Sequence, residues 1–172
     1  MISNEAVESA CSQVSEYSEE QMASEFERFF THQPDLCDFV VELTTESGQR
    51  IQELSLFLSY MVFKAVEHSG TPELTAVSQT TIETALQESE SWIEKINRIE
   101  GGELEAAILD KLSSDNEPHL LQYVISEINQ PLDDGTELGD EQKGEVFFVL
   151  KTVITSLSRR SIEKEGSNQT EQ

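Results

Sequence analysis

The sequence has few basic residues, and this scarcity limits the partners that it can bind. Lys and Arg total 11 against 34 Asp and Glu, which gives a formal net charge of -23 at pH 7. A surface of this sign repels phosphate groups at long range, so binding to nucleic acid or to an anionic membrane requires a basic patch. The only adjacent basic pair is Arg159-Arg160, near the end of the last helical pattern, where cations complement the helix dipole. We therefore expect no direct nucleic-acid partner and no membrane partner.

Cysteines and long apolar runs are also scarce. Cys11 and Cys37 are the two cysteines, and the chain has no C-x-x-C and no Cys/His cluster with metal-site spacing. Both lie among apolar residues at helical spacing, which favours packed, reduced thiols over a disulfide framework. The beginning, MISNEAVESA, lacks the basic and apolar regions of a signal peptide, and no apolar run approaches about 18 residues. These patterns predict a soluble cytoplasmic protein.

The common catalytic motifs are missing as well. The sequence contains no G-x-G-x-x-G, G-x-x-x-x-G-K, G-x-S-x-G or H-E-x-x-H. A di-iron bundle would carry Glu three residues before a histidine, but Phe29, Ala65 and Asn116 stand at those positions. We therefore predict no catalytic residue and no cofactor, and the balance of the sequence is against an enzyme.

Apolar residues recur at intervals of three and four along nearly the whole chain, which is typical of amphipathic helices. The sequence predicts an all-α, single-domain bundle of about seven or eight helices over residues 1–160, followed by a disordered tail over 161–172. Ser18 and Gln21 form a capping-box pattern, and Pro34 and Pro118 fit the first turn of a helix. The helices predicted at about 49–68 and 141–158 are the most apolar, so we expect them in the core.

Two segments of the chain echo one another. At an offset of 84, Pro34, Leu36 and Val40 align with Pro118, Leu120 and Val124. At an offset of 92, the apolar positions of 49–68 align with those of the last long helix. This predicts an internal duplication of a three-helix unit, with halves 18–68 and 103–158 joined by a helix over 78–99 and with the long helices packed near a pseudo-twofold axis. The alternative is that any two amphipathic helices can be aligned by their apolar positions.

Two groups of residues are weak candidates for a metal site. Hard cations such as Ca²⁺ or Mg²⁺ bind clustered oxygens, and one acidic loop supplies them, although its spacing does not match the EF-hand pattern. The weaker group, His32 and Asp35, lies at a helix start beside Cys37. The loop candidates are Asp133, Asp134, Glu137 and Asp140.

The function best supported by the sequence is that of a protein-protein interaction or adaptor module with a basic partner. An acidic surface steers association toward basic proteins, and a bundle offers grooves that accept a helix. Two other functions stay open: an enzyme or ligand carrier with a site between helices, and an acidic surface that only keeps the chain soluble in a salty cytoplasm. The apolar excess of residues 51–66 would also suit a homodimer.

Overall fold

The computed structural model describes residues 1–70, 74–97 and 110–167, and in these ranges every regular element is a helix. The predicted all-α bundle is confirmed. The predicted helix near 103–112 lies largely outside the described residues, although 110–113 are helical, and the last helix continues into the predicted tail. The elements are α1 (Asn4–Ser15), α2 (Glu19–His32), α3 (Pro34–Thr44), the short 3-10 helix η1 (Thr45–Ser47), α4 (Gln49–His68), α5 (Gln79–Asn97), α7 (Pro118–Ile128) and α8 (Asp140–Ser167).

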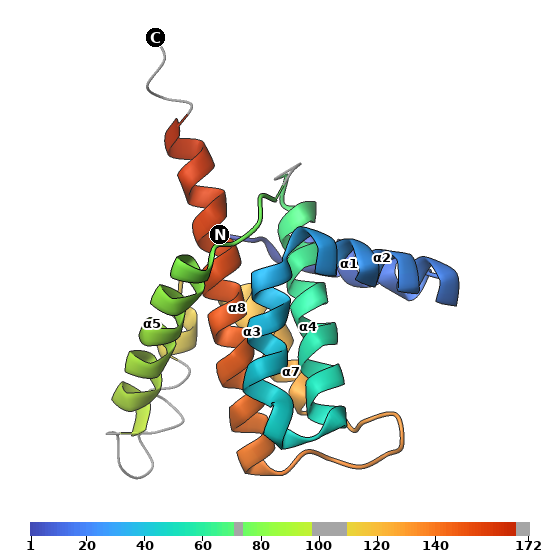
Figure 1. Cartoon of the computed structure of the whole chain (residues 1–172). Helices are drawn as coiled ribbons and strands as arrows, with labels where there is room; N and C mark the ends of the chain where they lie inside the picture. Colours follow the sequence, from blue (N-terminus) through green and yellow to red (C-terminus); the bar gives the residue numbers. More distant parts are fainter. Residues whose placement is uncertain (71–73, 98–109, 168–172) are drawn as a thin grey trace.

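The two long helices α4 and α8 lie side by side at the centre of the molecule (Figure 1). As predicted, their apolar stripes face one another and form the middle of the core. The shorter helices cover this pair: α1 and α3 pack on α4, and α5 and α7 pack on α8. The fully or almost fully buried residues of the central pair include Leu58, Met61, Val62, Ala65, Val146, Val149, Leu150, Val153, Ile154 and Leu157.

The helix-start signals of the sequence act as predicted. Gln21 N donates to Ser18 Oγ at 3.2 Å and Ser18 N donates to Gln21 Oε1 at 2.8 Å, which completes a capping box at α2. Pro34 and Pro118 occupy the first turns of α3 and α7. There the missing N–H has no intrahelical partner to lose, so the prolines fix the starts of both helices without a hydrogen-bond penalty.

A charged network fastens α2 to α4. Arg28 donates to Glu67 at 2.7 Å and to Glu25 at 3.0 Å, and its guanidinium lies 5.2 Å from the centroid of the Phe63 ring. Lys64, with only 8% of its side chain exposed, lies 3.1 Å from Glu25 Oε2. Because these charges are both paired and partly screened from water, their mutual attraction is stronger than that of an exposed salt bridge.

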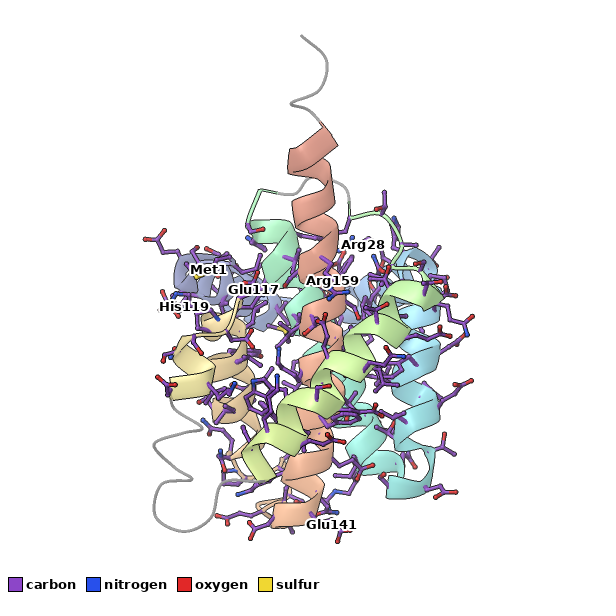
Figure 2. The ribbon with its side chains drawn as sticks, turned by 90° about the vertical axis from the view of Figure 1, so that its left-hand side faces the viewer. Met1, Arg28, Glu117, His119, Glu141 and Arg159 are labelled. Atoms are coloured by element: carbon purple, nitrogen blue, oxygen red, sulfur yellow. The ribbon has the colours of Figure 1, made fainter. Side chains whose placement is uncertain are left out.

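Two buried side chains each hold an extended segment of the chain, and we call them the clasps. Gln33 and Glu117 directly precede the helix-starting prolines and have nearly the same backbone angles, φ -131°, ψ 54° and φ -131°, ψ 61°. Gln33 Oε1 accepts a hydrogen bond from Val77 N at 2.9 Å, and Glu117 Oε2 accepts one from Ile2 N at 2.6 Å. Figure 2 shows Met1 beside Glu117. Each clasp thus fixes the segment that leads into another helix, α5 or α1.

The contacts of α1 and α5 follow a matching pattern. α1 packs on α4 and on α7, whereas α5 packs on α8 and on α3. Both helices are capped by a serine, Ser3 or Ser78, whose hydroxyl accepts from the amide three residues later. The helix that the sequence predicts as a joint between two halves therefore makes the same kinds of contact as the first helix of the chain.

Candidate protein-binding groove

Two adjoining hollows form one groove on the side of α4 and α7. In Figure 1, α1 and α2 project to one side near the top of α4, and the 129–139 connection projects to the same side at the bottom. The hollows have volumes of about 520 and 530 Å³, and they adjoin at Phe57 and Glu127, which line both. The groove is lined by Cys11, Val14, Ser15, Tyr17, Ser18, Glu19, Met22, Arg50, Glu53, Leu54, Phe57, Met61, Tyr123, Glu127, Gln130, Pro131, Leu132, Asp133 and Asp134.

The floor of the groove is apolar and comes mainly from one face of α4. Leu54, Phe57 and Met61 are spaced by three and four residues, so they lie along the same side of the helix. Met22 of α2 extends this surface. Phe26 stacks on Phe57 with 6.5 Å between ring centroids, which holds the Phe57 ring in place. A floor with two methionines adapts to the shape of a bound side chain, because methionine is flexible and polarisable.

The rim of the groove is acidic. Glu19 stands at one end, Asp133 and Asp134 stand at the other, and Glu53 lies between them. Among the described residues that line the groove, Arg50 is the single basic one, and it forms an ion pair with Asp134 at 2.9 Å. The groove therefore combines an apolar floor with an excess of negative charge along its edges.

A phenol, a thiol and a carboxylate meet in the middle of the groove. The Tyr123 hydroxyl interacts with the Cys11 thiol, and Glu127 lies one helical turn after Tyr123 on α7. Burial raises the pKa of the Cys11 thiol and of the Tyr123 hydroxyl. Both groups are consequently neutral at pH 7, and neither is activated as a nucleophile.

Glu127 is the exception among the partly buried carboxylates of the described residues. The others are Glu25, Glu67, Asp115, Glu117 and Glu145, and each has a hydrogen-bond donor or a cation within reach. Within the described part of the chain, no hydrogen bond or ion pair reaches the carboxylate of Glu127, and desolvation raises the pKa of this group. The groove thus holds a carboxylate without a counter-ion.

A second, polar pocket lies between α5, α8 and residues 115–117, near Glu117 and Arg159 in Figure 2. It has a volume of about 610 Å³ and contains the sole tryptophan, Trp92. Its charges pair with each other: Lys151 lies 2.9 Å from Asp115, and Arg159 contacts Glu88. Since these cations and anions are matched within the pocket, it attracts a charged ligand less than the groove does.

The metal candidates of the acidic loop lie on the connection between α7 and α8 and at the start of α8. Asp133 and Asp134 line the end of the groove, Glu137 is exposed on the same loop, and Asp140 starts α8. Asp134 contacts Arg50 and accepts a hydrogen bond from Thr136 Oγ1 at 2.6 Å.

The weaker pair lies away from this loop. His32 ends α2, with its Nδ1 2.8 Å from Arg28 O, and Asp35 is exposed in the first turn of α3. Among the residues that the structure describes, no three His, Cys, Asp or Glu side chains lie close enough together to hold a metal ion. Metal binding by either group stays a prediction.

Sequence reasoning did not single out Tyr123 or Glu127, and it placed Phe57 and Met61 only in the buried stripe of a core helix. No signal in the sequence separates Glu127 from the other acidic residues, because its burial depends on α1 lying beside α7.

Comparisons of the chain with models of protein families, with curated proteins and with solved structures gave no match. In the described residues, no helix is both long and apolar enough to span a membrane.

Proposed function

We propose that the protein is a protein-binding module whose groove accepts a basic amphipathic helix of another protein. The observation that carries this proposal is the apolar floor of α4 bordered by acidic side chains, with an unpaired carboxylate in its centre. An amphipathic helix binds such a groove through apolar anchors on one face. Its basic residues would then meet the acidic rim.

The dimensions of the groove fit a short helix. The α4 residues that line it run from Arg50 to Met61, a length of roughly 16 Å at about 1.5 Å per residue. This corresponds to about three helical turns, so a ligand would present anchors at i, i+3 or i+4, and i+7. Phe57 lies where the two hollows meet and is the central contact for such anchors.

The charge of the protein supports a basic partner rather than a second copy of itself. Two chains that each carry a formal charge of -23 repel one another, whereas a basic segment is steered toward the rim. The apolar excess of 51–66, which favours a homodimer in the sequence, is largely covered within one chain by α1, α3 and α8.

The same negative charge supports the proposal that the protein does not bind nucleic acid directly. The state of the two cysteines supports a cytoplasmic location. Neither cysteine forms a disulfide, and burial raises the pKa of the Cys37 thiol to about 12. A packed, protonated thiol suits a reducing compartment.

We also propose that the predicted halves 18–68 and 103–158 are related by duplication, and that the duplication extends to the helices that precede them, α1 and α5. The matching clasps and the matching contacts of α1 and α5 support this proposal. At the positions of the partly exposed Leu54 and Phe57, α8 carries Val146 and Val149, which are fully buried. In this view the second half has closed the surface that the first half keeps open, so the groove is the part of the fold that differs between the halves.

The groove is tested with three synthetic 18-residue peptides followed by fluorescence anisotropy. The first is amphipathic with an apolar face and arginine flanks, the second carries glutamate in place of arginine, and the third is a shuffled form of the first. We expect the first to bind tightest and to weaken as NaCl is raised from 50 to 500 mM, because salt screens the rim. Reaction of the partly exposed Cys11 thiol with a disulfide reagent should slow when the first peptide binds, while the buried Cys37 stays unreactive.

Substitutions locate the binding site. Phe57→Ala and Met22→Glu, on two different helices of the groove, should each weaken binding of the first peptide by roughly tenfold or more. Leu43→Ala is the matched control, because Leu43 is an exposed leucine on α3 outside the groove. Equal binding of all three peptides, or equal loss in the Leu43 variant, would contradict the proposal. Binding of none of them would leave the acidic surface with a role in solubility only.

A further inference from the structure

We infer that Glu127 recognises one arginine or lysine of the bound helix and that this contact makes binding depend on protons. The inference rests on the proposed function and identifies the chemistry at the centre of the same groove. It follows from the position of Glu127, from the groups that face it, and from the lack of a counter-ion for its carboxylate among the residues that the structure describes.

Glu127 lies where the two hollows of the groove meet. It lines both hollows, together with Phe57 across from it on α4. Tyr123, one turn earlier on α7, and Cys11, on α1, complete the middle of the groove. A basic side chain has an apolar stem and a charged end, so it can pack along Phe57 while its cation reaches the carboxylate.

Within the described ranges, the groups around Glu127 supply no unpaired positive charge. Tyr123 on α7 and Cys11 on α1 are neutral, and Glu8 on α1 adds negative charge near Cys11. The remaining ionisable groups of the groove are Tyr17 between α1 and α2, Glu19 on α2, Arg50 and Glu53 on α4, and Asp133 and Asp134 on the loop after α7. Among them only Arg50 is a cation, and Asp134 holds it at 2.9 Å. The charge that would balance Glu127 therefore has to come from the ligand.

Other partly buried carboxylates of the molecule have a cation or hydrogen-bond donors beside them. Glu25 receives hydrogen bonds from Arg28, Tyr60 and Lys64, and Asp115 pairs with the buried Lys151. Uncompensated burial of a charge is unfavourable, so such a group is rarely kept for stability. A group of this kind is typical of a binding site whose partner supplies the missing charge.

Protonation opposes the contact. Desolvation raises the pKa of Glu127, so its carboxylate becomes neutral at a higher pH than an exposed glutamate. A bound cation stabilises the ionised form, so binding lowers this pKa and releases a proton wherever the free groove is partly protonated. Affinity for a basic helix should therefore fall as the pH is lowered through the raised pKa.

The test uses the basic peptide with one central arginine and its isosteric analogue with citrulline, which is neutral. Affinities of the full-length protein for both are measured between pH 8 and pH 5. Wild type should prefer the arginine peptide by roughly tenfold or more at pH 7. This preference should shrink toward pH 5. Glu127→Gln should bind both peptides alike at every pH, whereas Glu42→Gln, exposed on α3 outside the groove, should keep the preference and its pH dependence.

The outcomes separate the two proposals. If wild type binds both peptides tightly and equally, the groove stands but the role of Glu127 is wrong. If wild type binds neither, both are wrong. Glu127→Gln also serves as its own folding control, because removal of an unpaired charge should leave the melting temperature equal or higher. If the folded Glu127→Gln variant retains the arginine preference, the inference is overturned.

Discussion

At the scale of single residues, Glu25 and Glu127 carry the same side chain in opposite environments. Glu25 is surrounded by Arg28, Tyr60 and Lys64, and Arg28 contributes most to lowering the pKa of its carboxyl group to about 2. The Glu127 carboxylate has no donor within the described residues, and burial raises its pKa. The first carboxylate stabilises the fold, and the second is available to a ligand.

The Glu25 environment predicts a specific pH dependence of stability. Its pKa is lower in the folded protein than the ordinary value of 4.5, so its contribution is present above pH 4.5 and is lost as the pH falls toward 2. Glu25→Gln should lower the free energy of unfolding by roughly 1 to 3 kcal/mol at pH 7 and much less near pH 2. Urea denaturation at several pH values measures this. Glu27→Gln, exposed on the same helix, is the control, and an equal loss in both variants would contradict the network.

The environments of individual polar side chains were harder to predict from the sequence than the apolar core was. The burial of Leu58, Val62 and Val149 follows from helical periodicity, because an apolar stripe must face the core. Periodicity does not say which acidic residue of a helix is covered by a neighbour. Tyr123 and Glu127 acquire their environment from Cys11 on a distant helix, so their role is visible only once α1 is placed.

At the scale of elements, the two clasps give the clearest prediction. Gln33→Ala and Glu117→Ala should each lower the free energy of unfolding by roughly 1 to 3 kcal/mol, because each leaves a buried backbone N–H without its acceptor. Chemical denaturation of both variants and of Gln49→Ala, an exposed glutamine at a helix start, provides the comparison. A large loss for one clasp and none for the other would contradict their equivalence and weaken the proposed duplication.

The sequence predicted helices better than it predicted their pairing. Local signals, such as the capping box at Ser18 and the prolines at α3 and α7, involve only a few neighbouring residues, so they can be recognised from the sequence alone. The clasps join residues that lie 44 and 115 positions apart. The sequence comparison aligned Pro34 with Pro118. It did not identify the preceding residues, Gln33 and Glu117, as equivalent, because they differ in charge although each accepts a hydrogen bond from a distant backbone N–H.

At the scale of the whole molecule, the net charge of -23 should have opposite effects on folding and on binding. Salt screens the repulsion among the acidic side chains, so the midpoint of thermal unfolding should rise between 50 and 500 mM NaCl. The same salt should weaken binding of the basic peptide. Calorimetry and anisotropy in matched buffers measure the two effects, with sucrose as a control for uncharged stabilisation. A midpoint that falls with NaCl would contradict net repulsion.

The Glu117 clasp also has a consequence for how the chain folds during synthesis. Ile2 leaves the ribosome long before its acceptor, since 115 positions separate them. At about 5 to 20 residues per second, this interval lasts roughly 6 to 23 s. Throughout it, the amide of Ile2 lacks its acceptor and α1 lacks α7, one of the helices on which it packs. The beginning of the chain would thus be among the last parts to reach its final contacts.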